Sequence, residues 1–444
     1  MKNLFLITVG ISISIALCGQ DNVKSFGSEN AGQSKVLVPN HQGSLVFGEH
    51  SKKGKKELLI YQTNNNNELI WSKSIAAKDP LVINDALATS SGGYVLAAEN
   101  YINNRESLLL INLDENGEEN WTSTFNEEGN EVEPYAIESS PTAYYIGGFT
   151  KLATLSVNFY YNFSVEKQFP YLLKTTLNGK KAWAKQIQLE NKNVVGDIRD
   201  IVLTKDNDLV FIANIYTPAS KTKSLTNYLV KINETGNVIW SKSISDRNIE
   251  FFELIIDKNQ NLYLAGKKTI SKKTTNVSLI KLTSEGNVIW AKEIGNNRIE
   301  IPIDLALHED EIYMSISTSS FDEKNRSQSL VLKLNKDGAI KSNFYLKQMD
   351  FSKISSLKSF NHNLYFCGSI IQISDHIRMN SISGSLNNLV HNNPTYSLTI
   401  KKDDLLFKTT PINLVNVINE ANPNLIEKDY KITITDEKIN SKKL

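Results

Sequence analysis

The six histidines are the first residues to consider for metal binding or proton transfer, because a neutral imidazole is a common metal ligand. No two of them have a spacing such as His-x-x-x-His, which would suit two ligands of one metal ion. They are His41, His50, His308, His362, His376 and His391. His41, His308 and His362 lie at or beside expected hairpin turns, where we interpret them as solvated turn residues. We therefore predict no metal site.

Acidic side chains offer two further kinds of chemistry, calcium binding and glycoside hydrolysis. The stretch DKNQN, from Asp257 to Asn261, matches the start of a calcium loop but lacks its glycine and its distal glutamate. Because Asp and Asn are good turn formers, we interpret this stretch as a turn. Glu131, Glu133 and Glu138 could supply the two carboxyl groups of a glycosidase, but nothing in the sequence singles them out.

Other catalytic signatures are missing from the sequence. It contains no Gly-x-Ser-x-Gly elbow, no phosphate-binding loop and no paired-cysteine metal motif. We therefore assign no catalytic residue and expect no cofactor. The 49 basic and 48 acidic residues leave a net charge of +1, which favours neither nucleic acid nor an anionic membrane surface as a partner.

An aromatic insertion is the strongest candidate for contact with a partner. It runs through VNFYYNF, from Val157 to Phe163, and carries Phe159, Tyr160, Tyr161 and Phe163. Aromatic rings in an exposed loop suit stacking on a sugar, a peptide or a partner protein. The alternative is that they fold down on the edge of their own sheet. Both interpretations stay open.

The N-terminus predicts export. One early lysine is followed by the uncharged stretch from Leu4 to Leu17, which is shorter than the ~20 apolar residues of a membrane-spanning helix. This pattern is typical of a secretory signal. We expect a signal peptide over residues 1–18, a polar tether over residues 19–33 and one folded domain over residues 34–444.

Cys18 lies at the end of the expected signal, in the sequence IALCGQD. The segment resembles a bacterial lipoprotein box, in which the cysteine is lipidated, although Leu17 departs from the usual small residue. The alternative is ordinary cleavage after Cys18 or Gly19. The mature chain is then either an outer-membrane lipoprotein or a free periplasmic or secreted protein. The only other cysteine is Cys367, so no internal disulfide is expected.

A repeat of about fifty residues organises the chain. All five tryptophans share one local pattern, with a turn residue four positions before and a large apolar residue four positions after. They are Trp71, Trp121, Trp183, Trp240 and Trp290, at spacings of 50, 62, 57 and 50 residues. Strand, turn and strand around each tryptophan predict a β-hairpin. A second hairpin lies between successive copies, as in NQNLYLAG from Asn259 to Gly266.

Two hairpins in each repeat give four strands, and such units predict an all-β fold of the β-propeller type. Stacked blades bury both faces of each small sheet. We count eight blades, with the eighth formed by Leu398–Thr410 and Ile418–Lys428. Seven blades followed by a C-terminal extension is the alternative, because the last units are degenerate.

The Gly-x-x-x-Trp unit resembles the PQQ-like propeller repeat, and more closely the SBBP-like repeats of secreted bacterial propellers. This resemblance implies architecture and leaves activity open. We expect a monomeric, non-enzymatic binding or scaffold module of the bacterial envelope, with an unknown protein or glycan partner held by rim loops. The alternative is a propeller enzyme of the glycan-cleaving or quinoprotein kind, which predicts a deep polar pocket on the axis.

Overall fold

The fold was analysed in a computed structural model of the chain. The structure describes residues 23–27 and 32–386 with short gaps, and beyond these only six strands near the C-terminus. The gaps are residues 53–54, 78, 103–104, 127–129, 153–167, 190–191, 194, 219–222, 245, 296–297, 320–326, 346–350 and 374–376. Within the described residues, no helix is long and apolar enough to cross a membrane.

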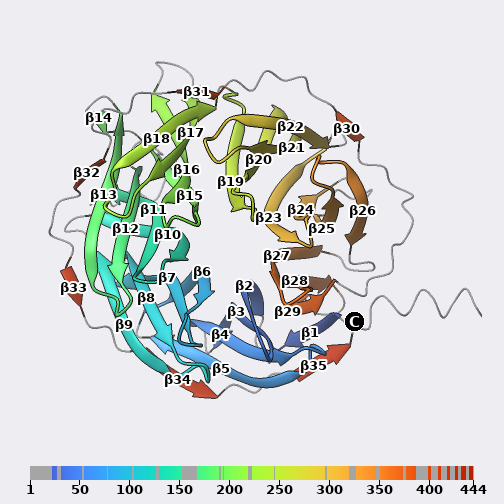
Figure 1. The fold of residues 1–444 in the computed structure, drawn as a ribbon. Coiled ribbons are helices and arrows are strands. Elements are labelled where there is room, and N and C mark those ends of the chain that lie inside the picture. The colour runs from blue at the N-terminus through green and yellow to red at the C-terminus, as the bar shows by residue number, and fades with distance from the viewer. Residues whose placement is uncertain are drawn as a thin grey trace, which may run out of the picture.

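Seven antiparallel sheets surround a central axis as the blades of a propeller (Figure 1). In blades 1–6 four consecutive strands follow each other from the axis outward. Blade 1 contains β2 (Gly32–Asn40), β3 (Gly43–Lys52), β4 (Lys55–Asn64) and β5 (Leu69–Ala77). Blade 2 contains β6 (Leu81–Ala88), β7 (Tyr94–Ile102), β8 (Arg105–Leu113) and β9 (Glu119–Asn126). Blade 3 contains β10 (Asn130–Ser139), β11 (Ala143–Leu152), β12 (Gln168–Thr176) and β13 (Lys181–Leu189), with the short β14 (Lys192–Asn193) beside it.

The next three blades repeat this order. Blade 4 contains β15 (Val195–Leu203), β16 (Leu209–Pro218), β17 (Lys223–Ile232) and β18 (Val238–Ile244). Blade 5 contains β19 (Ile249–Ile256), β20 (Leu262–Ser271), β21 (Thr274–Leu282) and β22 (Val288–Gly295). Blade 6 contains β23 (Glu300–His308), β24 (Glu311–Thr318), β25 (Gln328–Leu334) and β26 (Ile340–Tyr345). We call the side where the first and second strands join the turn face, and the opposite side the loop face.

Blade 7 closes the ring with strands from both ends of the chain. It contains β27 (Phe351–Phe360), β28 (Asn363–Ile373) and β29 (Ile377–Ser385), and β1 (Val23–Gly27) pairs with β29 as the fourth strand. The expectation of a tether over residues 19–33 therefore does not hold for Val23–Gly27. Phe26 explains this, because its ring is buried and lies 4.7 Å from the ring of Tyr61 in blade 1.

The C-terminal strands form a belt outside the blades, and the prediction of an eighth blade is wrong. The belt visits blades 5, 4, 3, 2, 1 and 7 in that order, pairing with the outermost strand of each (Figure 1). Its strands are β30 (Thr399–Lys401), β31 (Thr409–Pro411), β32 (Ile418–Glu420), β33 (Ile426–Lys428), β34 (Ile432–Asp436) and β35 (Asn440–Lys443). The two segments assigned to the eighth blade thus pair with four different blades. Seven blades with a C-terminal extension, the stated alternative, is the observed fold.

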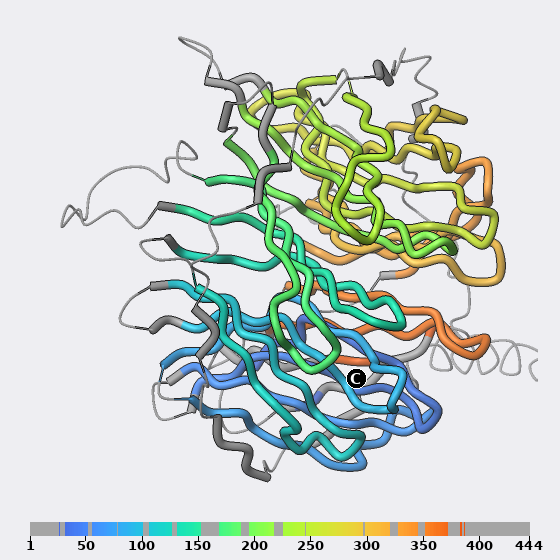
Figure 2. Tube along the Cα trace, turned by 60° about the vertical axis from the view of Figure 1, so that its left-hand side comes forward, coloured from blue at the N-terminus to red at the C-terminus, as the bar shows by residue number. Residues whose placement is uncertain are grey.

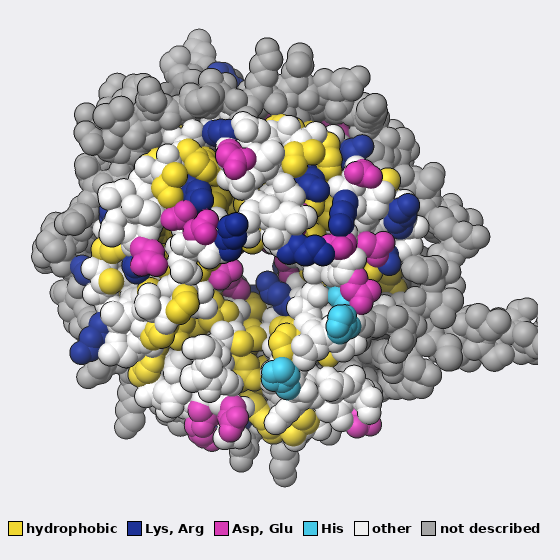
Figure 3. Space-filling model, viewed as in Figure 1, with side chains coloured by type: hydrophobic (Ala, Val, Ile, Leu, Met, Phe, Trp, Pro, Cys, Tyr) yellow, Lys and Arg dark blue, Asp and Glu magenta, His cyan; other side chains and the backbone are white. Residues whose placement is uncertain are grey.

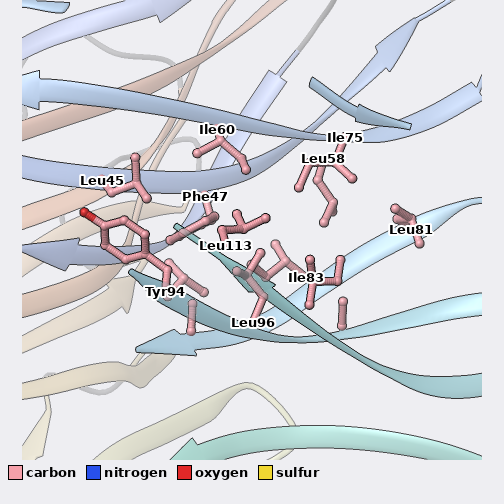
Figure 4. Packing of buried hydrophobic residues seen from close by; sticks show 14 of the residues in the cluster. Leu45, Phe47, Leu58, Ile60, Ile75, Leu81, Ile83, Tyr94, Leu96 and Leu113 are labelled. Carbon is pink, nitrogen blue, oxygen red and sulfur yellow. The ribbon is translucent and has the colours of Figure 1, made fainter. Parts of the chain in front are cut away.

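The hydrophobic core is divided into seven clusters, one between each pair of neighbouring blades. Figure 4 shows the cluster between blades 1 and 2, where Phe47 and Ile60 face Tyr94 and Leu96. The last cluster joins blade 7 to blade 1. Because every sheet buries both faces on its neighbours, successive blades fan around the axis (Figure 2).

Four of the five repeated tryptophans pack on a glycine of the next blade, and Lys185 packs on Gly236 in the remaining case. The ring of Trp71 in blade 1 packs on Gly117 in blade 2, and a Cβ built on Gly117 would lie 2.8 Å from Trp71 Cη2. The same contact joins Trp121 to Gly179, Trp240 to Gly286 and Trp290 to Gly338. Blade 7 has no tryptophan, and there Asn67 takes the glycine position and exchanges hydrogen bonds of 2.6 and 2.8 Å with Ser383.

We expect Gly117→Ala to destabilise the protein because of both its backbone and its neighbour. Gly117 has φ +76, and left-handed backbone costs about 1–3 kcal/mol in a residue with a side chain. Gly92→Ala is the matched control, since Gly92 has φ +91 and no atom within 4 Å of its built Cβ. Urea unfolding should show a larger loss for Gly117→Ala. Equal losses would show that the contact with Trp71 adds nothing.

Candidate functional site

A polar cavity of about 470 Å³ lies on the propeller axis. Residues from the innermost strand of all seven blades line it, which are β2, β6, β10, β15, β19, β23 and β27. Figure 3 shows acidic and basic side chains in the hollow at the centre of the ring. The cavity therefore gathers groups that lie far apart in the sequence.

A β-bulge in each inner strand aims side chains at this cavity. The strand register shifts at the same place in every blade, for example between Ile83 and Asp85 or between Pro302 and Asp304. A bulge bends the strand and re-aims the neighbouring side chain. The residue just after the bulge is acidic in four blades, as Asp85, Asp200, Glu253 and Asp304.

Three of these carboxylates link neighbouring blades by hydrogen bonds. Asp304 accepts hydrogen bonds from the amide of Leu305 in its own blade, at 2.8 Å, and from the amide of Leu357 in blade 7, at 2.6 Å. Asp85 joins blades 2 and 3 in the same way, and Asp200 joins blades 4 and 5. Because both oxygens of each group are committed to backbone amides, we assign the three aspartates a structural role.

Lys358 balances the acidic groups on the axis. The nearby Asp304 contributes most to raising the pKa of Lys358 above its usual range, with Asp85, Glu253 and Asp200 adding to the effect. Burial raises the pKa of Asp85 and Asp304, and the charge of Lys358 opposes this rise. Glu138 also lines the cavity, and burial raises its pKa to about 7. The cavity lining thus carries five carboxyl groups, together with the ammonium groups of Lys35 and Lys358 and the guanidinium of Arg199.

A second group of carboxylates lies toward the loop face, and we call it the mouth cluster. Its members are Glu99, Glu106, Glu131, Glu133 and Lys151. Lys151 Nζ lies 3.1 Å from Glu106 Oε2 and 2.6 Å from Glu131 Oε2. The carboxyl group of Glu99 accepts a hydrogen bond of 2.5 Å from Asn84 Nδ2. Lys151 therefore pairs with two of the four glutamates, and the charge of Lys35 acts on Glu99.

Two glutamates of the mouth cluster titrate near neutral pH. Burial raises the pKa of Glu99 to about 7, and Asn84 opposes this rise. Burial, together with the charges of Glu99 and Glu106, raises the pKa of Glu133 to about 8, and the charges of Lys151 and Arg199 oppose this rise. Within the described residues Glu133 has neither a hydrogen bond nor an ion pair through its side chain. Its carboxyl group is the least compensated of the cluster.

Arg199 lies beside the mouth cluster and is fixed from four sides. Its guanidinium binds Asp197 at 2.8 Å and reaches Glu250 at 3.5 Å. It also stacks over the rings of Tyr135 and Phe252, at 4.5 and 5.8 Å from the ring centroids. These contacts occupy Arg199, so its charge lowers the pKa of Glu133 without an ion pair between the two groups.

The residues that were considered for metal or calcium binding are not assembled into a site within the described residues. Across the part of the chain that is described, no group of three or more His, Cys, Asp or Glu residues could hold a metal ion. Asp257 forms a turn, as expected, because its Oδ1 accepts hydrogen bonds from the amides of Asn259 and Asn261. His41 and His362 are exposed at turns, whereas His308 is buried and contacts Ser359 Oγ at 2.9 Å. The interpretation of His308 as a solvated residue is therefore wrong.

Some of the other predicted site residues lie within the part of the chain that the structure describes, and others lie outside it. The five tryptophans lie on the outer strands of blades 1–5. Cys18 lies outside the described residues, as do Phe159, Tyr160, Tyr161 and Phe163. Of the three candidate glycosidase carboxylates, Glu131 and Glu133 belong to the mouth cluster and Glu138 lines the axial cavity.

The acidic residues on the axis were missed, although the sequence carries a signal for them. Asp85, Asp200, Glu253 and Asp304 each stand directly before two apolar residues in a strand that precedes a polar turn. An acidic residue repeated inside apolar strands needs a partner, because burying a charge is costly. That pattern could have indicated a shared acidic centre.

These features define the chain as a seven-bladed β-propeller with a carboxyl-rich axis. No protein-family model matches the sequence, and no curated protein matches it either. Solved structures with some similarity include a subtype N10 neuraminidase-like protein of A/little yellow-shouldered bat/Guatemala, at 7% identity and a TM-score of 0.38. That match covers 83% of this chain and 99% of the other.

A second similar structure is the Trypanosoma rangeli sialidase in complex with sialic acid. It shares 10% identity at a TM-score of 0.42, and the match covers 80% of this chain and 60% of the sialidase. Likeness at this level supports no argument about the ligand or activity of this chain. The site must be interpreted from its own residues.

Proposed function

We propose that the protein is an exported, non-enzymatic binding propeller of the bacterial envelope, and that it binds a small organic amine at the mouth cluster. The observation that carries this proposal is the carboxyl group of Glu133, which lies beside Glu99 and Glu106 and has no hydrogen bond or ion pair of its own among the described residues. An ammonium group placed there would pair with carboxylates that now raise each other's pKa. An amine suits this place better than a metal ion, since the described carboxylates lack the geometry of a metal site.

Binding is favoured over catalysis because the most deeply placed acids already have structural partners. Both carboxylate oxygens accept hydrogen bonds from backbone amides in Asp85, Asp200 and Asp304. These groups therefore serve as structural acceptors. Export is supported by the N-terminal sequence, with Cys18 either lipidated or removed with the signal. The segment of residues 153–167 follows β11 in the sequence, and in this proposal its aromatic residues contact a further protein or glycan partner.

Calorimetric titration with spermidine tests this proposal. We expect binding at about pH 8.5 that weakens about tenfold in Glu133→Gln, because one charge-assisted contact is lost. Binding should also weaken as the pH falls below about 8, where Glu133 becomes protonated. Glu115→Gln, at an exposed turn of blade 2, is the control. Equal affinity in wild type and Glu133→Gln would exclude the mouth cluster as the amine site.

Glycoside hydrolysis is the second candidate, and one observation favours it. Glu99 and Glu133 interact with each other and have pKa values of about 7 and about 8, which suits a carboxylic acid that donates a proton near neutral pH. A panel of nitrophenyl glycosides would reveal this activity. Release of nitrophenol by wild type, lost in both Glu99→Gln and Glu133→Gln, would make the protein an enzyme.

A further inference from the structure

A cleft between blades 4 and 5 opens on the turn face, away from the axial cavity. It has a volume of about 410 Å³. Its accessible apolar wall is formed by Trp240 of blade 4 and Ile256 of blade 5, and the buried Val210 and Leu262 complete the lining. Polar side chains from the turns of both blades surround this wall. Amphipathic clefts of this size are typical of sites for small polar ligands.

The indole N–H of Trp240 distinguishes this cleft from its neighbours. In blade 3 the N–H of Trp183 donates to the carbonyl of Glu234, at 3.3 Å. In blade 5 the N–H of Trp290 donates to the carbonyl of Lys336, at 3.0 Å. The position equivalent to these acceptors is Ser284, which lines the cleft. Among the described residues, however, no acceptor is bonded to the N–H of Trp240.

The polar rim of the cleft contains side chains without hydrogen-bond partners among the described residues. Its basic and acidic side chains balance in charge. Asp206 and Asn259 are exposed, and in the described part of the chain their side chains make no hydrogen bond. The lining residues carry two basic groups, Lys205 and Lys231, and two acidic groups, Asp206 and Glu285. Gln260 fixes the width of the cleft, because its Oε1 accepts a hydrogen bond from the amide of Lys205 across the blade boundary.

We infer that this cleft binds one uncharged pyranose unit of a glycan. The apolar wall suits the C–H face of a sugar ring, and the free indole N–H suits a hydroxyl oxygen as acceptor. The carboxylate of Asp206 and the amide of Asn259 suit neighbouring hydroxyl groups. The balanced charge of the rim favours a neutral ligand over an ionic one. This site is separate from the amine site proposed at the mouth cluster.

Saturation-transfer NMR with neutral methyl pyranosides tests this inference on the full chain. We expect at least one of the methyl glycosides of glucose, galactose, mannose and N-acetylglucosamine to bind with a Kd of about 1–10 mM. Trp240→Phe removes the N–H, keeps a ring and should weaken binding about fivefold. Trp290→Phe is the matched control, since the N–H of Trp290 already has an acceptor. Asn259→Ala changes an exposed residue and should also weaken binding.

Four outcomes would overturn the inference. They are the absence of binding by every pyranoside, equal weakening by Trp240→Phe and Trp290→Phe, unchanged binding in Asn259→Ala, and binding of the neutral dipeptide glycylglycine but of no sugar. Glu133→Gln separates this inference from the proposed function, because it should weaken spermidine binding and leave sugar binding unchanged. Loss of both ligands in that variant would contradict the independence of the two sites.

Discussion

The protein is expected to lose stability as the pH rises from about 5.5 to about 8.5, with a fall in Tm of roughly 5 °C. Four buried or half-buried carboxyl groups cause this effect, because their removal from water raises their pKa in the folded state. The pKa is about 7 for Glu99, about 8 for Glu133, about 7 for Glu138 and about 6 for Asp197. In the unfolded chain these groups titrate near 4.

The direction follows from proton binding. Between the unfolded and the folded pKa values, the folded state binds more protons than the unfolded state. The stability that these groups contribute is therefore fully present below about pH 4 and is lost as the pH rises through about 6 to 8. Partial exposure of Glu133 to solvent reduces the size of its share. Thermal unfolding followed by circular dichroism across this range measures the effect.

A single substitution should flatten this pH profile. Glu133→Gln keeps the shape of the side chain and removes its titration, so we expect a higher Tm than wild type at about pH 8.5 and little change at about pH 5.5. Glu115→Gln serves as the control at an exposed turn. A wild-type Tm that rises with pH would show that the carboxyl groups are stabilised as anions in the folded protein.

Asp304→Ala is expected to destabilise the protein by about 2–5 kcal/mol, the largest effect we expect from a single side chain. Asp304 is buried, with 7% of its surface exposed. Its removal leaves the amides of Leu305 and Leu357 without an acceptor and breaks one hydrogen-bonded link between blades 6 and 7. It also removes the group that contributes most to the pKa of Lys358. Urea unfolding measures the loss.

Two further variants make this result specific. Asp304→Asn keeps one acceptor oxygen and should lose less than the alanine variant. Asp337→Ala, at an exposed turn of the same blade pair, should change the unfolding free energy by less than about 0.5 kcal/mol. If Asp304→Ala and Asp337→Ala behaved alike, the hydrogen bonds between the blades would contribute nothing to stability.

The strands and the docking of the blades could be predicted from the sequence because both depend on neighbouring residues. Alternating apolar residues and a turn residue four positions before each tryptophan predict a hairpin, and β17–β18 around Gly236 is such a hairpin. The pairing of glycine and tryptophan also follows, since only a residue without a side chain fits beneath the ring of Trp71 or Trp290.

The end of the chain shows where this reasoning fails. Leu398–Thr410 resembles an inner hairpin because its apolar residues alternate in the same way. In the structure, β30 pairs with blade 5 and β31 with blade 4. A local pattern indicates that a segment is a strand, but it does not determine which edge the strand joins. For this reason, strands of the outer belt were predicted to form an eighth blade.

The functional candidates depend even more on long-range contacts. Glu99, Glu133 and Arg199 come from blades 2, 3 and 4, and only the ring brings them to one mouth. The sequence could not show that the N–H of Trp240 has no acceptor among the described residues, because its context GNVIW is the same as that of Trp290. The difference lies in the neighbouring blade, where one carbonyl binds the indole and the other does not.

The sequence by itself determined the four-stranded blade, the repeat and the tryptophan that docks one blade on the next, because turn chemistry and alternating burial act over a few residues. The tertiary structure alone decided that seven blades close the ring. In the closed ring, Phe26 of β1 packs in one cluster with Tyr365 and Cys367 of β28, which lie more than 330 residues later in the sequence. Once that contact buries the last open sheet face, no surface is left for an eighth blade, and the remaining strands pair along the outer edges.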